Sequence, residues 1–175
     1  MERKILITGV AGSGKSTISK TLNILGYEAY DIENINGLFA MYRKDTGELF
    51  KDYNDADLEK VKNADWLCDV KKLKELLEQQ KEDLAFYCGI ASNMDDIMPF
   101  FNKIIVLKIS SDILDKRLLS REGTDEFANT KEGRQALLGW KDWWEEKMEK
   151  KGVIMINADG KPNEVVDMIT KKLID

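Results

Sequence analysis

The sequence predicts an α/β protein: a three-layer α/β/α sandwich around a five-stranded parallel sheet. Short, continuous apolar runs alternate along the chain with segments in which apolar residues recur at helical spacing. This alternation is typical of parallel strands that are buried on both faces and joined by helical crossovers. A glycine-rich loop also joins the first apolar run to a helix, and in such folds a loop of this kind lies at the carboxyl edge of the sheet, where ligands bind.

The first half of the chain contains two strands and a long insertion. The strands are expected at residues 4–8 and 28–31. A helix over 17–25 separates them and ends at Gly26. Residues 32–82 show no strong strand pattern, so we predict a helical insertion there. Its clearest helix is expected over 69–80, because three leucines share one face, namely Leu73, Leu76 and Leu77.

The second half continues the alternation of strands and helices. Its strands are expected at residues 84–88, 104–107 and 153–156. Residues 92–95 can cap a short helix that ends near Phe101, and Ser110 or Ser111 caps the next helix. Residues 121–133 are polar and contain two glycines, which predicts a short mobile lid. Two more helices are expected, one carrying Leu137, Trp140, Trp144 and Met148, and one running from Pro162 to Leu173.

Length and composition limit the possible classes of protein. A chain of 175 residues, 43% of them hydrophobic, predicts one domain with a substantial core. No apolar stretch reaches about 18 residues and the start of the chain does not resemble a signal peptide, so we expect a cytoplasmic protein with no membrane contact. The net charge of −5 disfavours a nucleic-acid partner. These features leave the oligomeric state open.

Cysteine and histidine usage narrows the chemistry. Cys68 and Cys88 are too few and too far apart for a disulfide framework or a Cys-x-x-Cys metal site, so both are expected to be reduced core residues. The chain has no histidine, which excludes imidazole as a general base or metal ligand. Any catalysis must therefore use lysine, arginine, carboxylates and backbone amides, a set that suits phosphoryl transfer.

Residues 9–16 read Gly-Val-Ala-Gly-Ser-Gly-Lys-Ser, a complete Walker A pattern between the first strand and the first helix. Its glycines allow backbone N–H groups to surround a phosphate chain, and the following helix favours an anion at its N-terminus. In this motif Lys15 contacts the β- and γ-phosphates, and the Ser16 hydroxyl binds Mg²⁺. We therefore predict the P-loop NTPase fold and a triphosphate site formed by Gly9, Val10, Ala11, Gly12, Ser13, Gly14, Lys15, Ser16 and Thr17.

Other motifs help to decide between the classes of P-loop protein. A switch GTPase would carry Asp-x-x-Gly and Asn-Lys-x-Asp, but the only Asn-Lys, at residues 102–103, is followed by two isoleucines. A motor or AAA-type ATPase would show an apolar strand that ends in Asp-Glu, and the sequence contains none. Both classes are disfavoured. Because the loop itself does not select the base, a GTP-using enzyme stays open.

The remaining pattern resembles the small P-loop kinases, the superfamily that includes adenylate, shikimate and gluconate kinases. The resemblance rests on the phosphate loop, on the acids Asp31 and Glu33 after the second strand, and on Arg117 and Arg121 before the lid. It implies ATP and Mg²⁺ as cofactors and a small-molecule phosphoryl acceptor. It also implies that Arg117 lies over the adenine, that Arg121 reaches the transferring phosphoryl group, and that backbone groups near Ala158 hold the adenine edge. The implied catalytic residues are Lys15, Arg121 and Asp31.

The same resemblance places the acceptor against the insertion, the turn after the third strand and the lid. The candidate acceptor contacts are Asp31, Glu33, Tyr42, Arg43, Trp66, Gly89, Asn93 and Arg134. Glu33 differs from the second acid of the Asp-x-Asp that shikimate kinases carry, which disfavours shikimate itself. Trp66 is also interpreted as a packing residue, and the tryptophans at positions 140, 143 and 144 are expected to serve core or helix packing.

Two functions stay open at this point. One is a kinase whose acceptor is a nucleoside monophosphate or a polar hydroxylated metabolite. The other is a nucleotide-binding regulatory protein with weak hydrolysis. The regulatory function stays open because the predicted lid offers few cationic groups beyond Lys131 and Arg134 to support phosphoryl transfer.

Overall fold

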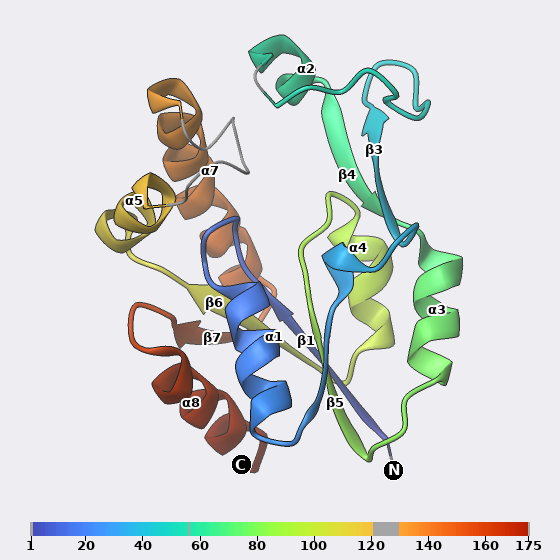
Figure 1. Cartoon of the computed structure of the whole chain (residues 1–175), viewed down its shortest axis with the longest axis vertical. Helices are drawn as coiled ribbons and strands as arrows, with labels where there is room; N and C mark the ends of the chain where they lie inside the picture. The colour runs from blue at the N-terminus through green and yellow to red at the C-terminus, as the bar shows by residue number, and fades with distance from the viewer. Residues whose placement is uncertain (1, 56, 121–129, 175) are drawn as a thin grey trace.

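The computed structural model describes residues 2–55, 57–120 and 130–174. Its main sheet consists of β1 (Arg3–Thr8), β2 (Glu28–Asp31), β5 (Leu84–Cys88), β6 (Lys103–Lys108) and β7 (Ile154–Asn157). The strands lie in the order β2-β5-β1-β6-β7 (Figure 1). Every neighbouring pair is parallel, so the connections cross over the sheet as the alternating pattern predicts. The predicted fold class is confirmed.

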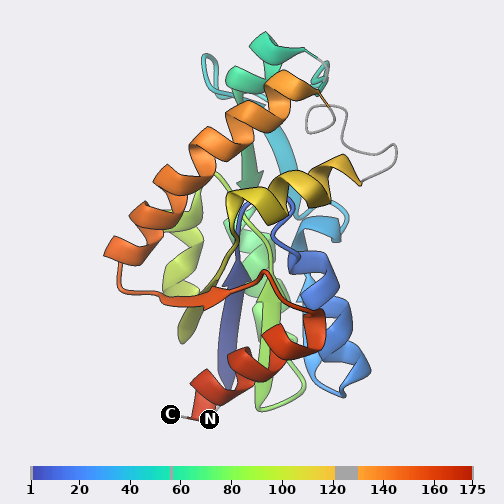
Figure 2. The same cartoon turned by 90° about the vertical axis from the view of Figure 1, so that its left-hand side faces the viewer.

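Helices cover both faces of this sheet (Figures 1 and 2). They are α1 (Lys15–Ile24), α3 (Val70–Glu78), α4 (Met94–Ile97), α5 (Ser111–Leu119), α7 (Lys131–Lys150) and α8 (Pro162–Ile174). Ile5 and Ile7 of β1 pack with α1 and α8, whereas Leu6 belongs to the core that includes α3, α4, α5 and α7. The central strand is buried on both faces, which is why its sequence is continuously apolar. Within the described ranges, no helix has the length and apolar character needed to cross a membrane.

The insertion after β2 contains two strands that the sequence pattern did not indicate. A short helix, η1 (Ile32–Asn34), leads to β3 (Phe39–Arg43), and α2 (Leu58–Lys62) leads to β4 (Ala64–Cys68). The two strands form an antiparallel pair above the carboxyl end of the main sheet (Figure 1). Most residues on both faces of these strands are half-buried. The sequence therefore lacks the alternation of apolar and polar residues that indicates a strand. The insertion is therefore mixed rather than helical throughout.

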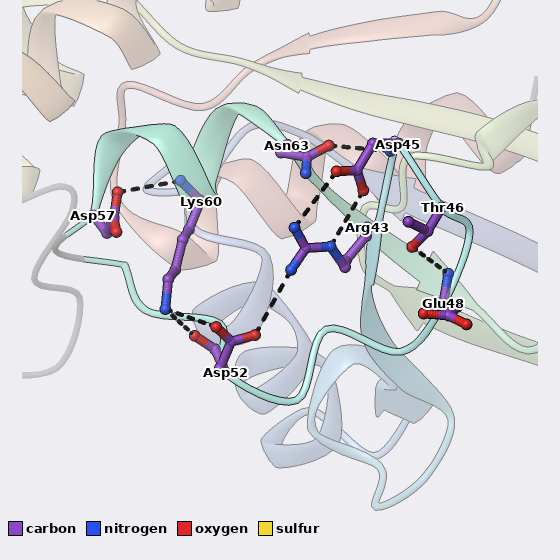
Figure 3. A network of polar contacts seen from close by, with 8 residues as sticks. All are labelled: Arg43, Asp45, Thr46, Glu48, Asp52, Asp57, Lys60 and Asn63. Atoms are coloured by element: carbon purple, nitrogen blue, oxygen red, sulfur yellow. Dashed lines mark hydrogen bonds and ion pairs between the residues drawn. The ribbon is translucent and has the colours of Figure 1, made fainter.

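An exposed polar network holds the tip of this insertion (Figure 3). Arg43 donates from Nε and Nη2 to the two carboxylate oxygens of Asp45, at 3.2 and 3.4 Å, and its Nη1 lies 3.8 Å from Asp52 Oδ1. The hydrogen bond to Asp45 raises the pKa of the Arg43 guanidinium. Lys60 of α2 pairs with Asp52 at 3.0 Å, so side chains connect the end of β3 to α2.

Three helix starts differ from expectation. Ser110 is the N-cap residue of α5, but its side chain makes no capping hydrogen bond to the described residues. Asn93 precedes α4, but its amide bonds the backbone N–H and C=O of Cys68, both at 3.0 Å, instead of capping the helix. Thr130 caps α7 by accepting from the Gly133 N–H at 2.9 Å. The helix begins at Lys131, so the last three residues of the predicted lid are helical. Its other residues before Thr130, 121–129, lie outside the described ranges.

Candidate functional site

The phosphate loop runs from the carboxyl end of β1 to the N-terminus of α1. Gly12 and Gly14 adopt left-handed backbone conformations, with φ of +86° and +103°, which side chains disfavour. A Cβ on Gly12 would also lie 2.6 Å from Leu114 Cδ1 of α5. Gly14 is the N-cap of α1 and has no side chain to occupy the first free amides of the helix, so these remain available to an anion.

The polar groups of the loop fit a phosphate chain. Ser13 Oγ is buried, and the described part of the chain gives it no hydrogen-bond partner. A buried hydroxyl without a partner is costly, so this atom suits a ligand oxygen. Ser16 and Thr17 are exposed in the first turn of α1, where a hydroxyl can bind Mg²⁺. The described residues hold no cluster of three Cys, Asp or Glu suited to a metal. Binding of Mg²⁺ through Ser16 stays a prediction.

Lys15 is folded back onto its own loop. Its Nζ donates to the Gly9 carbonyl at 2.8 Å and to the Val10 carbonyl at 3.3 Å, and it lies 3.6 Å from Glu33 Oε2. The side chain is only 8% exposed. The ammonium thus sits between the phosphate loop and the acid that follows β2. To contact a β- or γ-phosphate it must exchange at least some of these partners for phosphate oxygens.

Glu33 connects the phosphate loop to the insertion. While its Oε2 faces Lys15, its Oε1 accepts from Trp66 Nε1 at 3.2 Å. Trp66 in turn stacks on Phe39, with ring centroids 5.4 Å apart, so β3 and β4 hold the indole in place. Sequence reasoning named Glu33 and Trp66 separately and missed their contact, because β4 had not been recognised. The indole packs as interpreted, and its contact with an acceptor stays a prediction.

Asp31 ends β2 beside the phosphate-binding edge of the sheet. Its Oδ2 accepts from Asn34 Nδ2 at 2.7 Å, and its backbone is paired with Cys88 of β5. Burial raises the pKa of the Cys88 thiol, and the Asp31 charge adds to this effect. The thiol therefore stays protonated and is not a nucleophile. Asp31 is a half-buried carboxylate with one side-chain hydrogen bond, so it retains acceptor capacity for a substrate hydroxyl.

Arg117 borders a cavity of about 370 Å³ next to the loop. Its Nη2 donates to the Ala158 carbonyl at 2.8 Å and its Nη1 to the Ser13 carbonyl at 3.3 Å. The guanidinium thus joins α5 to the phosphate loop and to the turn after β7. The cavity is lined by residues from these segments and from α1 and α8, among them Gly12, Thr17, Ile18, Ala158, Gly160 and Val165. The structure therefore brings the two segments to which the base was assigned, α5 and the turn after β7, next to the phosphate loop.

Replacing Arg117 with lysine is expected to weaken ATP binding by roughly tenfold. A lysine keeps the charge but cannot donate to two carbonyls in one plane or stack on a base. Calorimetric titration with Mg-ATP measures the change, and Lys116→Ala, an exposed neighbour on α5, is the control. Equal affinity in the Arg117→Lys variant and the original protein would contradict this role.

The turn after β5 fits closely against η1. A Cβ on Gly89 would lie 2.6 Å from Ile32 Cγ1 and 3.3 Å from Glu33 Cγ, and the Gly89 N–H donates to the Ile7 carbonyl at 3.0 Å. Gly89 is therefore needed for close packing beside Glu33. Asn93 lies farther along the same segment, where it bonds the backbone of Cys68. Its amide holds β4 against α4, a positioning role that leaves acceptor contact a prediction.

The remaining candidates stand apart from the loop or outside the described ranges. Arg43 is engaged by Asp45 and Asp52 at the tip of the insertion. Arg134, in the first turn of α7, lies with its Nε 3.5 Å from Asp115 Oδ1 of α5. For both arginines, acceptor contact stays a prediction. Arg121 falls among residues 121–129, of which the structure gives no description, so its role also stays a prediction.

Three features define a P-loop nucleotide-binding protein with the small-kinase fold. They are the phosphate loop between β1 and α1, the strand order and the cavity beneath Arg117. Residues 5–137 match a family model described as an AAA domain, and the chain belongs to that family. The family's description as an AAA domain contrasts with the sequence analysis, which disfavoured an AAA-type ATPase. That expectation rested on the absence of an apolar strand ending in Asp-Glu. In agreement with it, none of the described main-sheet strands ends in such a pair.

Similarity to known proteins supports this assignment. A dephospho-CoA kinase from Fusobacterium nucleatum is 31% identical over 124 residues, which span 70% of this chain and only 61% of that protein. Two solved structures share the fold at 18% sequence identity. A deoxyadenosine kinase from M. mycoides with bound dATP has a TM-score of 0.58, covering 99% of this chain and 100% of that one. A shikimate kinase from Bacteroides thetaiotaomicron has a TM-score of 0.59 and covers 99% of each chain.

Proposed function

We propose that the protein transfers the γ-phosphoryl group of Mg-ATP to a small acceptor. The observation that carries this proposal is the contact between Lys15 of the phosphate loop and Glu33 after β2, at 3.6 Å. Because the lysine of this motif contacts the β- and γ-phosphates, the contact supports transfer toward the acids at the edge of the insertion. The kinase names of the related proteins support the same reaction class. Because ATP is an intracellular metabolite, we also propose that the protein works in the cytoplasm.

The proposed roles follow from position and chemistry. The acceptor oxygen attacks the γ-phosphorus, the bond to the β–γ bridging oxygen breaks, and ADP leaves. Asp31 orients the acceptor hydroxyl and takes its proton, and Lys15 stabilises the charge on the phosphoryl oxygens. Mg²⁺, when held through Ser16 and the phosphates, would neutralise part of that charge. Arg121 is proposed as a second cation for the phosphoryl group.

A binding measurement followed by an acceptor screen tests this proposal. Calorimetry with Mg-ATP is expected to show binding at one site, and ADP formation is expected to rise when the right acceptor is added. The panel contains nucleoside monophosphates, deoxynucleosides, dephospho-CoA, shikimate and gluconate. Tight ATP binding that no acceptor accelerates would contradict the kinase proposal and favour a nucleotide-binding regulatory protein. Competition by GTP at the same site measures the base preference.

A further inference from the structure

The acceptor side of the phosphate loop carries more negative than positive charge. Asp31 ends β2, and Glu33 follows it in η1 at the edge of the insertion. Among the described residues, Lys15 is the cation that forms an ion pair with one of these acids, with its Nζ 3.6 Å from Glu33 Oε2. One paired ammonium thus stands against two carboxylates before any nucleotide is bound.

Binding of a triphosphate makes this imbalance larger. The lysine of the motif contacts the β- and γ-phosphates, so Lys15 then shares its charge with phosphate oxygens. Glu33 is held at this edge by its second oxygen, which accepts from Trp66 Nε1 at 3.2 Å, and the indole is stacked on Phe39. The turn after β5 packs on the same side chain, since a Cβ on Gly89 would lie 3.3 Å from Glu33 Cγ. The carboxylate therefore keeps its place when the ammonium turns to the phosphates.

The described arginines do not offset this charge. Each is engaged by a group in another part of the molecule, namely Arg3 by the Leu173 carbonyl, Arg43 by Asp45, Arg117 by the Ala158 carbonyl and Arg134 by Asp115. A phosphate monoester carries about two negative charges at neutral pH, and arginine is the residue that binds such a group in a bidentate manner. Within the described ranges, a phosphate entering beside Asp31 and Glu33 would meet two carboxylates and no available guanidinium.

An uncharged hydroxyl group suits the same place. Asp31 Oδ2 accepts from Asn34 at 2.7 Å, and the carboxylate has further lone pairs for a hydroxyl donor. A hydroxyl must lose its proton when its oxygen attacks phosphorus, and a carboxylate within hydrogen-bond reach can take that proton. A phosphate acceptor arrives already ionised and has no need of a base.

We infer that Asp31 and Glu33 select an acceptor that presents an uncharged hydroxyl group to the γ-phosphorus, and reject one that presents a phosphate. The acceptor is then an alcohol, such as a nucleoside or a sugar, rather than a nucleoside monophosphate that becomes a diphosphate. This inference rests on the proposed kinase function and names its substrate class. The hydroxyl oxygen forms the new bond to phosphorus, its proton passes to Asp31, and ADP leaves, so the product is a phosphate monoester.

The chemical linkage in the product tests this inference. The acceptor screen is extended by matched pairs, each a nucleoside and its 5′-monophosphate, which share the base and the sugar. Phosphorus NMR of the purified product identifies an anhydride by its phosphorus–phosphorus coupling and an ester by the absence of that coupling. We expect every phosphorylated acceptor to carry a new ester. Formation of a nucleoside diphosphate would overturn the inference and leave the kinase proposal standing.

Binding gives a second measure that needs no transfer. The protein is saturated with Mg²⁺ and a non-hydrolysable ATP analogue, which fills the γ-phosphate position, and each matched pair is titrated by calorimetry. The monophosphate should bind roughly tenfold or more weakly than its nucleoside, because a charge within about 4–6 Å shifts an equilibrium by that much. Glu33→Gln keeps an acceptor for Trp66 but removes one charge, so it should narrow this difference. Glu75→Gln, at an exposed position on α3, is the matched control and should leave it unchanged.

The outcomes separate this inference from the proposed function. A protein that transfers phosphoryl groups to no acceptor would overturn the kinase proposal. In such a protein, weaker binding of the monophosphate that Glu33→Gln relieves would still support the selection by charge. Equal affinity for the nucleoside and its monophosphate, or a difference that Glu33→Gln leaves unchanged, would overturn the role given to Glu33.

Discussion

Replacing Lys15 with alanine is expected to lower kcat by about 10³-fold, the upper range for loss of one group that stabilises transition-state charge. Its ammonium is proposed to contact phosphoryl oxygens on which charge develops. The fold should persist, because the partners of Nζ among the described residues are two carbonyls of its own loop and the partly exposed Glu33. Initial rates of ADP formation with the acceptor measure the loss, and thermal unfolding checks that the variant is folded.

The control for this substitution is Lys20→Ala, at an exposed position on the same helix. It removes an equal charge at a distance from the loop and should leave turnover within about twofold, since exposed charges contribute little. If Lys15→Ala retained the turnover of the original protein in the presence of acceptor, the proposed role of the loop in transfer would be wrong. A Lys15→Ala variant that had unfolded would instead show a shifted melting transition.

The sheet and the phosphate loop could be predicted because their residues are constrained locally. Strands such as Leu84–Cys88 are buried on both faces and read as continuous apolar runs, and the loop needs glycine at positions such as Gly12 and Gly14, where φ is positive. Neither constraint depends on knowing the rest of the fold. The parallel direction of the strands followed from the helical crossovers, but their order came only from the structure.

The acceptor side could be predicted only in outline, because its contacts join distant segments. Glu33 meets Trp66 across 33 residues, and Asn93 bonds Cys68 across 25. No periodicity indicates such pairs, and the pattern of β3 and β4 is hidden by half-buried residues on both faces. The exposure of Trp140 and Trp143 was missed for a related reason: helical spacing shows that they lie near Trp144, but only the neighbouring elements determine which of them is covered.

Glu33 and Asp31 occupy neighbouring positions but have different partners, which suggests a division of labour between them. Glu33 is shared between the Lys15 ammonium and the Trp66 indole, so both of its oxygens are engaged. Asp31 receives one hydrogen bond, from the Asn34 amide, and its other oxygen has capacity for a further donor. Glu33 is therefore better placed to position Lys15 and the insertion. Asp31 is better placed to act on the acceptor hydroxyl.

Replacing Asp31 with asparagine is expected to lower kcat by about 10²- to 10⁴-fold, the range for loss of a general base, while the KM for ATP changes little. The amide has the shape of the carboxylate and can still accept from Asn34, but it cannot take a proton. Initial rates of ADP formation with acceptor, measured at saturating ATP, give the change in kcat. Asn34→Ala, which removes only the hydrogen-bond partner, is the control and should lower kcat far less.

A Glu33→Gln variant shows which of the two carboxylates has which role. The glutamine can still accept from Trp66 but no longer pairs with the Lys15 charge, so its main effect should be on the KM values for ATP and acceptor rather than on kcat. If Glu33→Gln lowered kcat more than Asp31→Asn did, the two assignments would be exchanged. If neither variant lowered kcat by more than about tenfold, phosphoryl transfer would proceed without a carboxylate base, by positioning and charge stabilisation alone.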